Sequence, residues 1–331
     1  MGEWIGRDRK ARRCYGFDEI ALVPGAVTIN PEEVDISWEI NGKKFLIPFL
    51  ASAMDGVVDP KFAIAMGKLG GIAVLNLEGI YTRYDHYAPI LEDIAKATPE
   101  KATELVQKLY LKPIKEGLIA KRIREIKKAG VPAVVSTIPQ HAEKFGKIAQ
   151  EAGCDIFVIQ STVTTVRHIS KSYKVVDLKK LCKQLKMPVI VGNSVTYQVA
   201  VELMETGISG LLIGIGPGSA CTTRGVIGVG VPQVTAICDS MAARDFYFKK
   251  SRRYIPIIAD GGMSTGGDVC KAFACGADAV MVGSPLPGRK RRPDADFTGE
   301  WQHLMPIFRA ERAFEWEQPE RLKKFCLGPL S

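Results

Sequence analysis

Short apolar runs recur along this chain, and within each run the apolar residues are consecutive rather than alternating with polar ones. Such runs are typical of parallel strands that are buried on both faces of a sheet. Stretches with apolar residues at helical spacing separate them, which indicates helices between the strands. The pattern predicts eight strands, at residues 45–50, 72–75, 133–136, 156–160, 188–191, 210–214, 255–259 and 279–282.

Eight strand and helix units in succession predict an α/β fold, a (β/α)8 TIM barrel. A doubly wound open sheet is the alternative, because its strands have the same pattern. The interval after the second strand is longer than one helix requires, so we expect a helical insertion of two or three helices at about 85–128. We interpret the Lys and Arg residues of this insertion as solvated helix faces rather than as a binding patch. The predicted domain organisation is a catalytic barrel over 1–286 followed by an atypical tail at 287–331.

Composition limits the protein class further. A hydrophobic fraction of 46% in 331 residues fits a globular protein. No stretch approaches the roughly 18 apolar residues of a membrane span, so we expect a cytoplasmic protein without a membrane partner. Eight cysteines without a CxxC pair, and four isolated histidines, give a zinc site little support and favour reduced thiols. The net charge of +9 suits either nucleic acid or a substrate that carries phosphate.

The Gly-rich stretch "GIGPGSACTTRGVIGVG" at 214–230 follows the sixth predicted strand, at the end where barrels carry their chemistry. It is not a dinucleotide-binding fingerprint, because a cysteine stands where that motif starts its helix. Free cysteine is most often a buried structural residue. On an active face, however, Arg224 and nearby backbone amides would lower the pKa of Cys221. This position makes Cys221 a candidate nucleophile.

Two further loops have the composition of a phosphate and ribose site. "ADGG" at 259–262 places Asp260 directly after the seventh strand, where a carboxylate either caps a turn or accepts hydrogen bonds from a ribose diol. Its glycines admit a phosphate to backbone amides. "VGS" at 282–284 repeats this composition after the eighth strand, and Ser219 would complete the cradle. Together the loops predict a nucleoside monophosphate beside a reactive cysteine, at the barrel's preferred phosphate position.

Four segments carry a family resemblance: "YGFDEIALVPG" at 15–25, "ASAMDG" at 51–56, "GIGPGSACTTRGVIGVGVPQVTAI" at 214–237 and "IADGGMSTGGDVCKAFACGADAVMVGSPL" at 258–286. They resemble the IMP dehydrogenase/GMP reductase family, and most of all its IMP dehydrogenase-related branch, which lacks the regulatory CBS pair. The resemblance covers residue 5 to about 286, and the cysteine-loop motif is highly specific.

The resemblance implies an oxidoreductase that acts at C2 of a purine 5'-monophosphate, converting IMP to XMP or GMP to IMP with NAD(P). It implies that Cys221 forms the covalent adduct and that Thr223 belongs to the dyad that handles the proton of water or ammonia. The implied substrate-binding residues are Ser52, Met54, Asn193, Ser219, Asp260, Gly262, Gly283 and Ser284. The implied potassium ligands are the backbone carbonyls of Gly216, Gly218 and Cys221. The family also implies a homotetramer or octamer. The chemistry agrees with this, because purine C2 is electron-poor and a thiolate is a strong nucleophile.

Two segments depart from the family pattern. Many members have an aspartate after the fourth strand that meets the nicotinamide ribose; this chain has Gln160, Ser161 and Thr162, which we take as the cofactor-facing positions. The segment "NLEGIYTRYDHY" at 76–87 also differs from the usual dehydrogenase pattern. The direction of the reaction stays open between dehydrogenase and reductase.

After Leu286 the family pattern stops, and no flap with a catalytic Glu or an Arg-Tyr pair is recognisable in 287–331. Our hypothesis is a one-nucleotide frameshift near residue 287. The basic run at 289–292 is then an out-of-frame continuation. Nucleic-acid binding through it has no support from interleaved aromatic residues, and we expect no nucleic-acid partner. The alternative to an active enzyme is a catalytically impaired purine-nucleotide-binding protein that lacks its flap.

Overall fold

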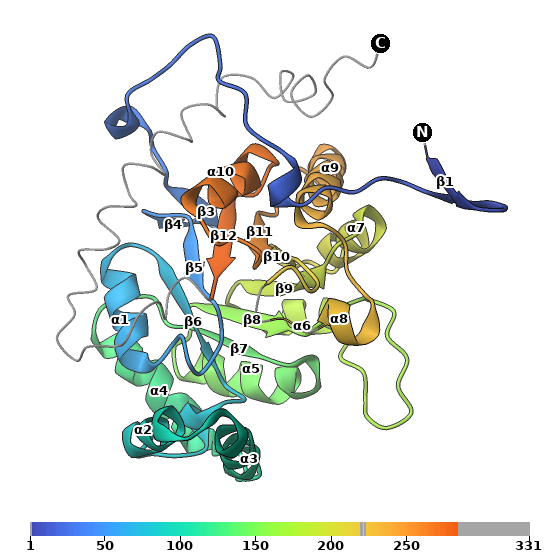
Figure 1. The fold of residues 1–331 in the computed structure, drawn as a ribbon. Coiled ribbons are helices and arrows are strands. Elements are labelled where there is room, and N and C mark those ends of the chain that lie inside the picture. The colour runs from blue at the N-terminus through green and yellow to red at the C-terminus, as the bar shows by residue number, and fades with distance from the viewer. Residues whose placement is uncertain (1, 219–220, 222, 284–331) are drawn as a thin grey trace.

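The structure is a computed structural model, and it describes residues 2–218, 221 and 223–283. Eight parallel strands form a closed barrel in the order β10-β11-β12-β5-β6-β7-β8-β9 (Figure 1). Their bounds are β5 (Phe49–Ala51), β6 (Ile72–Asn76), β7 (Val134–Thr137), β8 (Ile156–Gln160), β9 (Val189–Ser194), β10 (Gly210–Ile213), β11 (Ile257–Asp260) and β12 (Ala279–Val282). The predicted TIM barrel is confirmed. The open-sheet alternative is wrong, because the last strand pairs with the first, Val280 opposite Phe49.

The first predicted strand, 45–50, needs a correction. Its start belongs to β4 (Lys43–Phe45), which pairs antiparallel with β3 (Trp38–Ile40) in a hairpin outside the barrel. The barrel strand begins only at Phe49. Pro48 stands between the two, and proline has no amide hydrogen to donate to a ladder. A continuous apolar run therefore spans two different elements.

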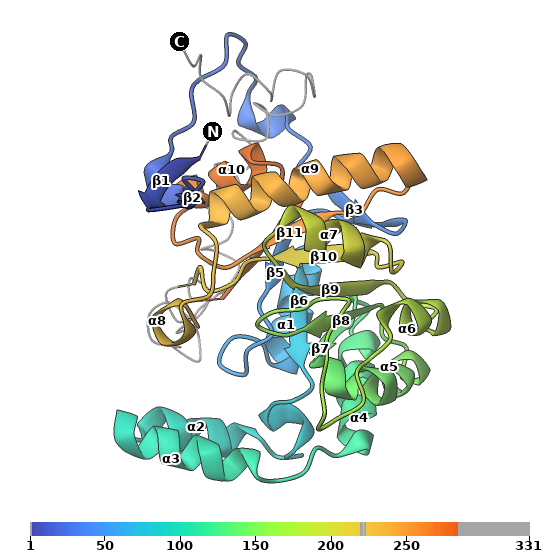
Figure 2. The ribbon, with the colours of Figure 1, turned by 90° about the vertical axis from the view of Figure 1, so that its right-hand side faces the viewer.

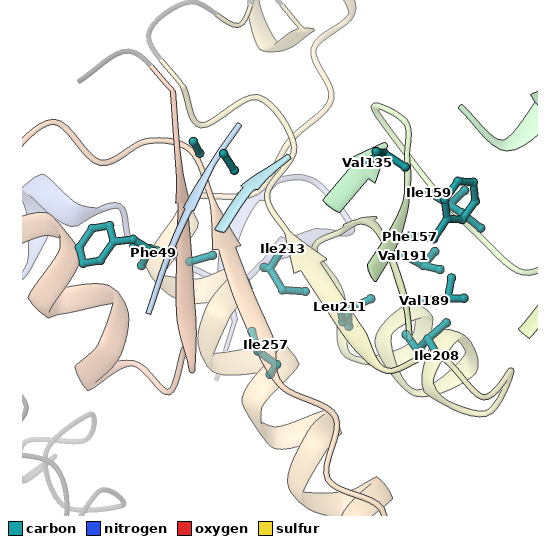
Figure 3. Packing of buried hydrophobic residues seen from close by; sticks show 14 of the residues in the cluster. Phe49, Val135, Phe157, Ile159, Val189, Val191, Ile208, Leu211, Ile213 and Ile257 are labelled. Atoms are coloured by element: carbon teal, nitrogen blue, oxygen red, sulfur yellow. The ribbon is translucent and has the colours of Figure 1, made fainter. Parts of the chain in front are cut away.

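The barrel strands are unbroken apolar runs because their alternate residues enter two different cores. Leu50, Val158 and Ile258 belong to a cluster that the hairpin residues Trp38 and Ile40 join. Their neighbours along the strands belong to a larger cluster with the surrounding helices, part of which is seen in Figure 3. A side chain on Gly210, the first residue of β10, would come within 3.1 Å of Ile40, so the hairpin covers the N-terminal end of the barrel. The opposite end stays open for chemistry.

Helices alternate with the strands, as a barrel requires. They are α1 (Pro60–Lys68), α4 (Glu116–Lys128), α5 (Ala142–Glu151), α6 (Leu178–Gln184), α7 (Tyr197–Met204), α9 (Gln233–Ser251) and α10 (Gly266–Ala274). The short α8 (Thr223–Ile227) lies in the cysteine loop. The short 3-10 turns are η1 (Phe17–Glu19), η2 (Pro31–Glu33), η3 (Ile80–Thr82) and η4 (Pro139–His141).

The interval after β6 holds three helices, which agrees with the two or three expected there. The third, α4, packs against α1 and α5 and is the barrel's own helix at this position. The other two, α2 (Ala88–Lys96) and α3 (Pro99–Tyr110), pack on each other and extend away from the barrel (Figure 2). They are the true insertion.

The N-terminal segment forms an arm. Its hairpin, β1 (Glu3–Gly6) with β2 (Arg9–Ala11), lies away from the barrel (Figure 1). Directly after β2 in the chain, Arg12 forms an ion pair with Asp239 of α9 at 2.6 Å. Among the described residues, no helix is long and apolar enough to cross a membrane.

Candidate active site

Cys221 lies exposed in the loop between β10 and α8. Its Sγ is 3.2 Å from Oγ1 of Thr223, and its backbone amide donates to the carbonyl of Gly218 at 3.0 Å. Hydrogen bonds from the Thr223 side chain and backbone lower the pKa of the thiol, with a smaller contribution from the charge of Arg224. Because the thiolate is the nucleophilic form, this environment favours attack on an electrophilic carbon.

Arg224 holds the cysteine loop in shape. Its Nε donates to the carbonyl of Ile215 at 3.2 Å, and its guanidinium also donates to the carbonyl of Val231. A Cβ on Gly216 would lie 2.6 Å from the Arg224 side chain, and one on Gly230 would lie 2.5 Å from Nε. Gly216 also has a φ of +69°, which disfavours side chains. Because Gly216 and Gly230 carry no side chains, the Arg224 side chain fits beside them. The effect of Arg224 on Cys221 is therefore chiefly structural.

Asp260 ends β11 and anchors a network across the strand ends. Its Oδ2 accepts hydrogen bonds from Nδ2 of Asn193 and from Nε2 of Gln160, both at 2.8 Å. Asn193 also donates to the carbonyl of Gly214 at 2.8 Å. The network therefore joins β8, β9 and β11 to the start of the cysteine loop. Burial raises the pKa of Asp260 to about 6, and the two amide donors partly oppose that rise.

The loop after β11 packs directly on the cysteine loop. Gly262 has a φ of +83°, and a Cβ there would lie 2.9 Å from Pro217. A Cβ on Gly261 would lie 3.6 Å from the amide nitrogen of Gly218. The close approach of these backbones brings the Asp260 loop and the Cys221 loop to one place, as the sequence predicted.

Ser52, Met54 and Gly283 also come together. The amide of Ser52 donates to the carbonyl of Val282 at 2.9 Å. A Cβ on Gly283 would lie 3.3 Å from Sδ of Met54 and 3.4 Å from Oγ of Ser52. Met54 is 47% exposed, so its thioether is open to a ligand. Two other predicted site residues, Ser219 and Ser284, lie outside the described residues.

The three predicted cofactor positions differ in their surroundings. Gln160 contacts Asp260, so it joins the predicted substrate residues. Ser161 uses its hydroxyl within its own turn, donating to the carbonyl of Val163 at 2.9 Å and lying 2.8 Å from Oγ1 of Thr164. Thr162 is exposed. Of the three, only Thr162 has a side chain that the described contacts leave open.

Sequence reasoning missed a second polar cluster, at the ends of β6 and β7. The carboxylate of Glu78 lies 3.0 Å from Nδ1 of His141 and accepts hydrogen bonds from the hydroxyl of Thr137 and the amide of Ile138. The signal was present in "NLEG", where an acidic residue follows a buried strand. Its partner is 63 residues away, so no local pattern joins them.

Asp55, after β5, has a structural role near the Glu78 cluster. Its Oδ2 accepts hydrogen bonds from the amide of Ile80 and the hydroxyl of Tyr110, both at 2.6 Å. Tyr110 ends α3, so this carboxylate ties the helical insertion to the barrel. Burial and the negative charge of Asp55 raise the pKa of Tyr110.

The model of the family described as IMP dehydrogenase / GMP reductase domain matches residues 14–303. The chain belongs to this family. An uncharacterized oxidoreductase of Mycolicibacterium smegmatis is 37% identical over 289 residues, which are 85% of this chain and 77% of that protein. The inosine-5'-monophosphate dehydrogenase of Cryptosporidium parvum is 35% identical, over 84% of this chain and 68% of that one.

A solved structure supports the same assignment. The crystal structure of an IMP dehydrogenase/GMP reductase-like protein from Corynebacterium glutamicum has a TM-score of 0.79 and 36% identity, and the match covers 86% of this chain and 76% of that one. The predicted family is therefore confirmed, and the chain is an oxidoreductase of the IMP dehydrogenase/GMP reductase family. The frameshift hypothesis concerns residues 287–331, which lie outside the described residues.

Proposed function

We propose that this chain acts at C2 of a purine 5'-monophosphate through a covalent adduct of Cys221, with NAD(P) as the hydride carrier. One observation carries the proposal: an exposed cysteine with a lowered pKa lies in a loop that packs against the loop of a buried carboxylate. A thiolate adds to the electron-poor C2. In IMP oxidation the tetrahedral adduct then gives up a hydride; in GMP reduction it first loses ammonia, and the resulting trigonal C2 receives the hydride before the thiolate departs.

The surrounding residues fit a nucleotide. Oδ2 of Asp260 is occupied by the amides of Gln160 and Asn193, and these bonds leave Oδ1 to accept from ribose hydroxyls. Gly262 and Gly283 let a phosphate approach backbone amides. The exposed thioether of Met54 would contact the base. Ser52, beside Gly283, would flank the base with Met54, and Ser219 and Ser284 would join the two glycines in holding the phosphate.

The proposed sites for NAD(P) and potassium both lie at the C-terminal ends of the barrel strands. NAD(P) would supply the hydride acceptor or donor, and Gln160, Ser161 and Thr162 are the residues proposed to face it. Backbone carbonyls are ligands that proteins use for potassium. The carbonyls of Gly216, Gly218 and Cys221 belong to the cysteine loop, in which the amide of Cys221 donates to the carbonyl of Gly218 at 3.0 Å. We propose that this loop holds potassium and that the protein forms a homotetramer or octamer.

Two assays test the function and its direction. IMP with NAD+ and GMP with NADPH are each followed at the nicotinamide absorbance band, with and without potassium. IMP oxidation consumes water and releases XMP, reduced cofactor and a proton. GMP reduction consumes two protons and releases IMP, oxidised cofactor and ammonium. Turnover in either assay supports the proposal, and the active pair defines the direction.

The second candidate is a purine-nucleotide-binding protein without turnover. It is favoured by the absence of a recognisable flap motif in residues 287–331. Calorimetry with IMP and GMP separates the two candidates. Nucleotide binding with no absorbance change in either assay identifies the impaired form, whereas an absence of binding contradicts both candidates.

A further inference from the structure

We propose that His141, held by Glu78, is the acid–base group that exchanges the proton of the reaction at the barrel mouth. The proposal rests on the proposed function and adds a residue pair to it. His141 is the acid–base residue in this assignment, and Glu78 is a positioning residue that acts through it.

The contact geometry fixes the imidazole. Nδ1 of His141 lies 3.1 Å from one carboxylate oxygen of Glu78 and 3.0 Å from the other. A carboxylate only accepts hydrogen bonds, so Nδ1 carries the hydrogen and donates it. In the neutral ring, Nε2 then has the free lone pair. Among the described residues, no hydrogen bond occupies Nε2. This is the arrangement by which a carboxylate prepares a histidine to act as a base.

Glu78 is itself held at several points. Its carboxylate also accepts from the Thr137 hydroxyl, and its own amide donates to Oδ1 of Asn76 at 2.9 Å. The guanidinium of Arg83 donates to its backbone carbonyl at 3.1 and 2.9 Å. Glu78 is thus held through both its backbone and its carboxylate, so the carboxylate keeps its position and orients its neighbour without reorganising.

The Glu78 side chain is more buried than the His141 side chain, as proton exchange at the imidazole requires. The Glu78 side chain is 18% exposed, whereas that of His141 is 44% exposed. The carboxylate is therefore largely shielded, and the imidazole is open to solvent.

The cluster lies on the chemical face of the barrel. Asn76 ends β6 and Thr137 ends β7, just as Asp260 ends β11. In a closed barrel of parallel strands, all of these ends surround one mouth. The Glu78 cluster therefore shares the mouth with the Asp260 network and the cysteine loop.

The chemistry requires such a group in either direction. In IMP oxidation, water attacks C2 of the oxidised purine that is still bound to Cys221. Nε2 takes a proton from the water as the water oxygen bonds to C2 and the thiolate departs. When GMP is reduced, the protonated imidazole gives its proton to the departing ammonia as the C2–N bond breaks. The hydroxyl of Thr223 is too weak an acid or base to do this alone. Histidine is the side chain that ordinarily exchanges protons near neutral pH.

The other charges around His141 are paired with one another. On α5, Glu143 pairs with Lys174 at 3.3 Å and Lys144 pairs with Glu116 of α4 at 2.7 Å. Phe145 contacts the imidazole ring itself, with the two ring centroids 5.0 Å apart. Glu78 is therefore the charged group in direct contact with the imidazole in the described part of the chain.

The test measures kcat at saturating nucleotide from pH 5 to 9 for wild type, His141→Ala, Glu78→Gln and a control, His168→Ala. His168 is also an exposed histidine on a loop after a barrel strand, with Nε2 2.7 Å from the hydroxyl of Tyr173. We expect kcat to fall by about 100-fold in His141→Ala and about tenfold in Glu78→Gln, and to stay within about twofold in the control. Added imidazole should restore part of the rate of His141→Ala only.

Melting temperature and IMP or GMP binding are measured on every variant, so that a folding defect is recognised. A rate in His141→Ala that equals the wild-type rate overturns the inference, as does a loss that imidazole does not restore and that leaves the pH profile unchanged. Either result leaves the proposed function intact, provided that the wild type turns over. A wild type without turnover contradicts the proposed function first, and the inference with it.

Discussion

Gln160 donates a hydrogen bond of 2.8 Å to Asp260, and the two residues lie 100 positions apart in the chain. The bond joins the end of β8 to the end of β11 across the barrel mouth. It places an expected cofactor position against an expected ribose ligand. Under the proposed function, substrate and cofactor binding would be linked through this one carboxylate.

Nucleotide affinity should depend on pH through Asp260. Burial raises its pKa to about 6, and ribose hydroxyls donate best to the ionised carboxylate. IMP or GMP should therefore bind more tightly as the pH rises from 5 to 7, and binding should release protons below pH 7. Calorimetry in two buffers of different ionisation enthalpy measures both effects. Asp260→Asn should bind weakly at every pH, and a wild-type affinity that does not change over this range would contradict the assignment.

The same pKa makes a prediction for the free protein. A carboxyl group with a raised pKa binds protons more readily in the folded than in the unfolded chain. Its contribution to folding is therefore greatest below its ordinary value near 3.8 and is lost as the pH rises through about 6. Asp260→Asn should flatten the dependence of the unfolding free energy on pH in this window, which urea denaturation at pH 5 and pH 7 measures. An equal pH dependence in variant and wild type would show that the carboxyl is not the source.

Cys221 should be the first cysteine to react with iodoacetamide. It is exposed, whereas the other cysteines in the described part of the chain are buried or half-buried, and burial raises the pKa of Cys154 to about 12. Thr223→Val removes the hydroxyl that favours the thiolate, so labelling at neutral pH should slow by several-fold. Peptide mass spectrometry measures the rates, with Thr235→Val as a control on α9. Equal labelling rates in wild type and Thr223→Val would show that the Thr223 hydroxyl does not stabilise the Cys221 thiolate.

The shape of the cysteine loop should depend on Gly216 but not on Gly225. Alanine at 216 would have a φ of +69° and a Cβ 2.6 Å from Arg224, whereas alanine at 225 meets nothing within 4 Å. Gly216→Ala should lower the unfolding free energy by about 1 to 2 kcal/mol and reduce turnover. Gly225→Ala should leave both unchanged or slightly improve the helix. Denaturant unfolding and steady-state assays compare the two. If both variants behave alike, Arg224 does not organise the loop.

The strands and the principal loops could be predicted because their causes are local. Each barrel strand buries both faces, which leaves a continuous apolar run, and small or polar residues follow where the strand reaches the mouth. The apolar run at 45–50 gave a wrong start for the first barrel strand, because Phe45 before Pro48 belongs to β4 whereas Phe49 after it belongs to β5. The contacts of Gln160 with Asp260 and of Glu78 with His141 join distant strand ends, and only the closure of the barrel brings them together. The roles assigned to the site residues all stay predictions, and Ser219 and Ser284 lie outside the described residues.

The first turnover of the Cys221→Ala variant tests the central claim most directly. Wild type and variant are saturated with nucleotide, mixed rapidly with the matching cofactor and followed at the nicotinamide absorbance band. The covalent mechanism predicts that the rate constant of this absorbance change is at least about a thousandfold lower in the variant than in wild type, while calorimetry shows that the nucleotide still binds. Hydride transfer at a comparable rate without the thiol would contradict the account.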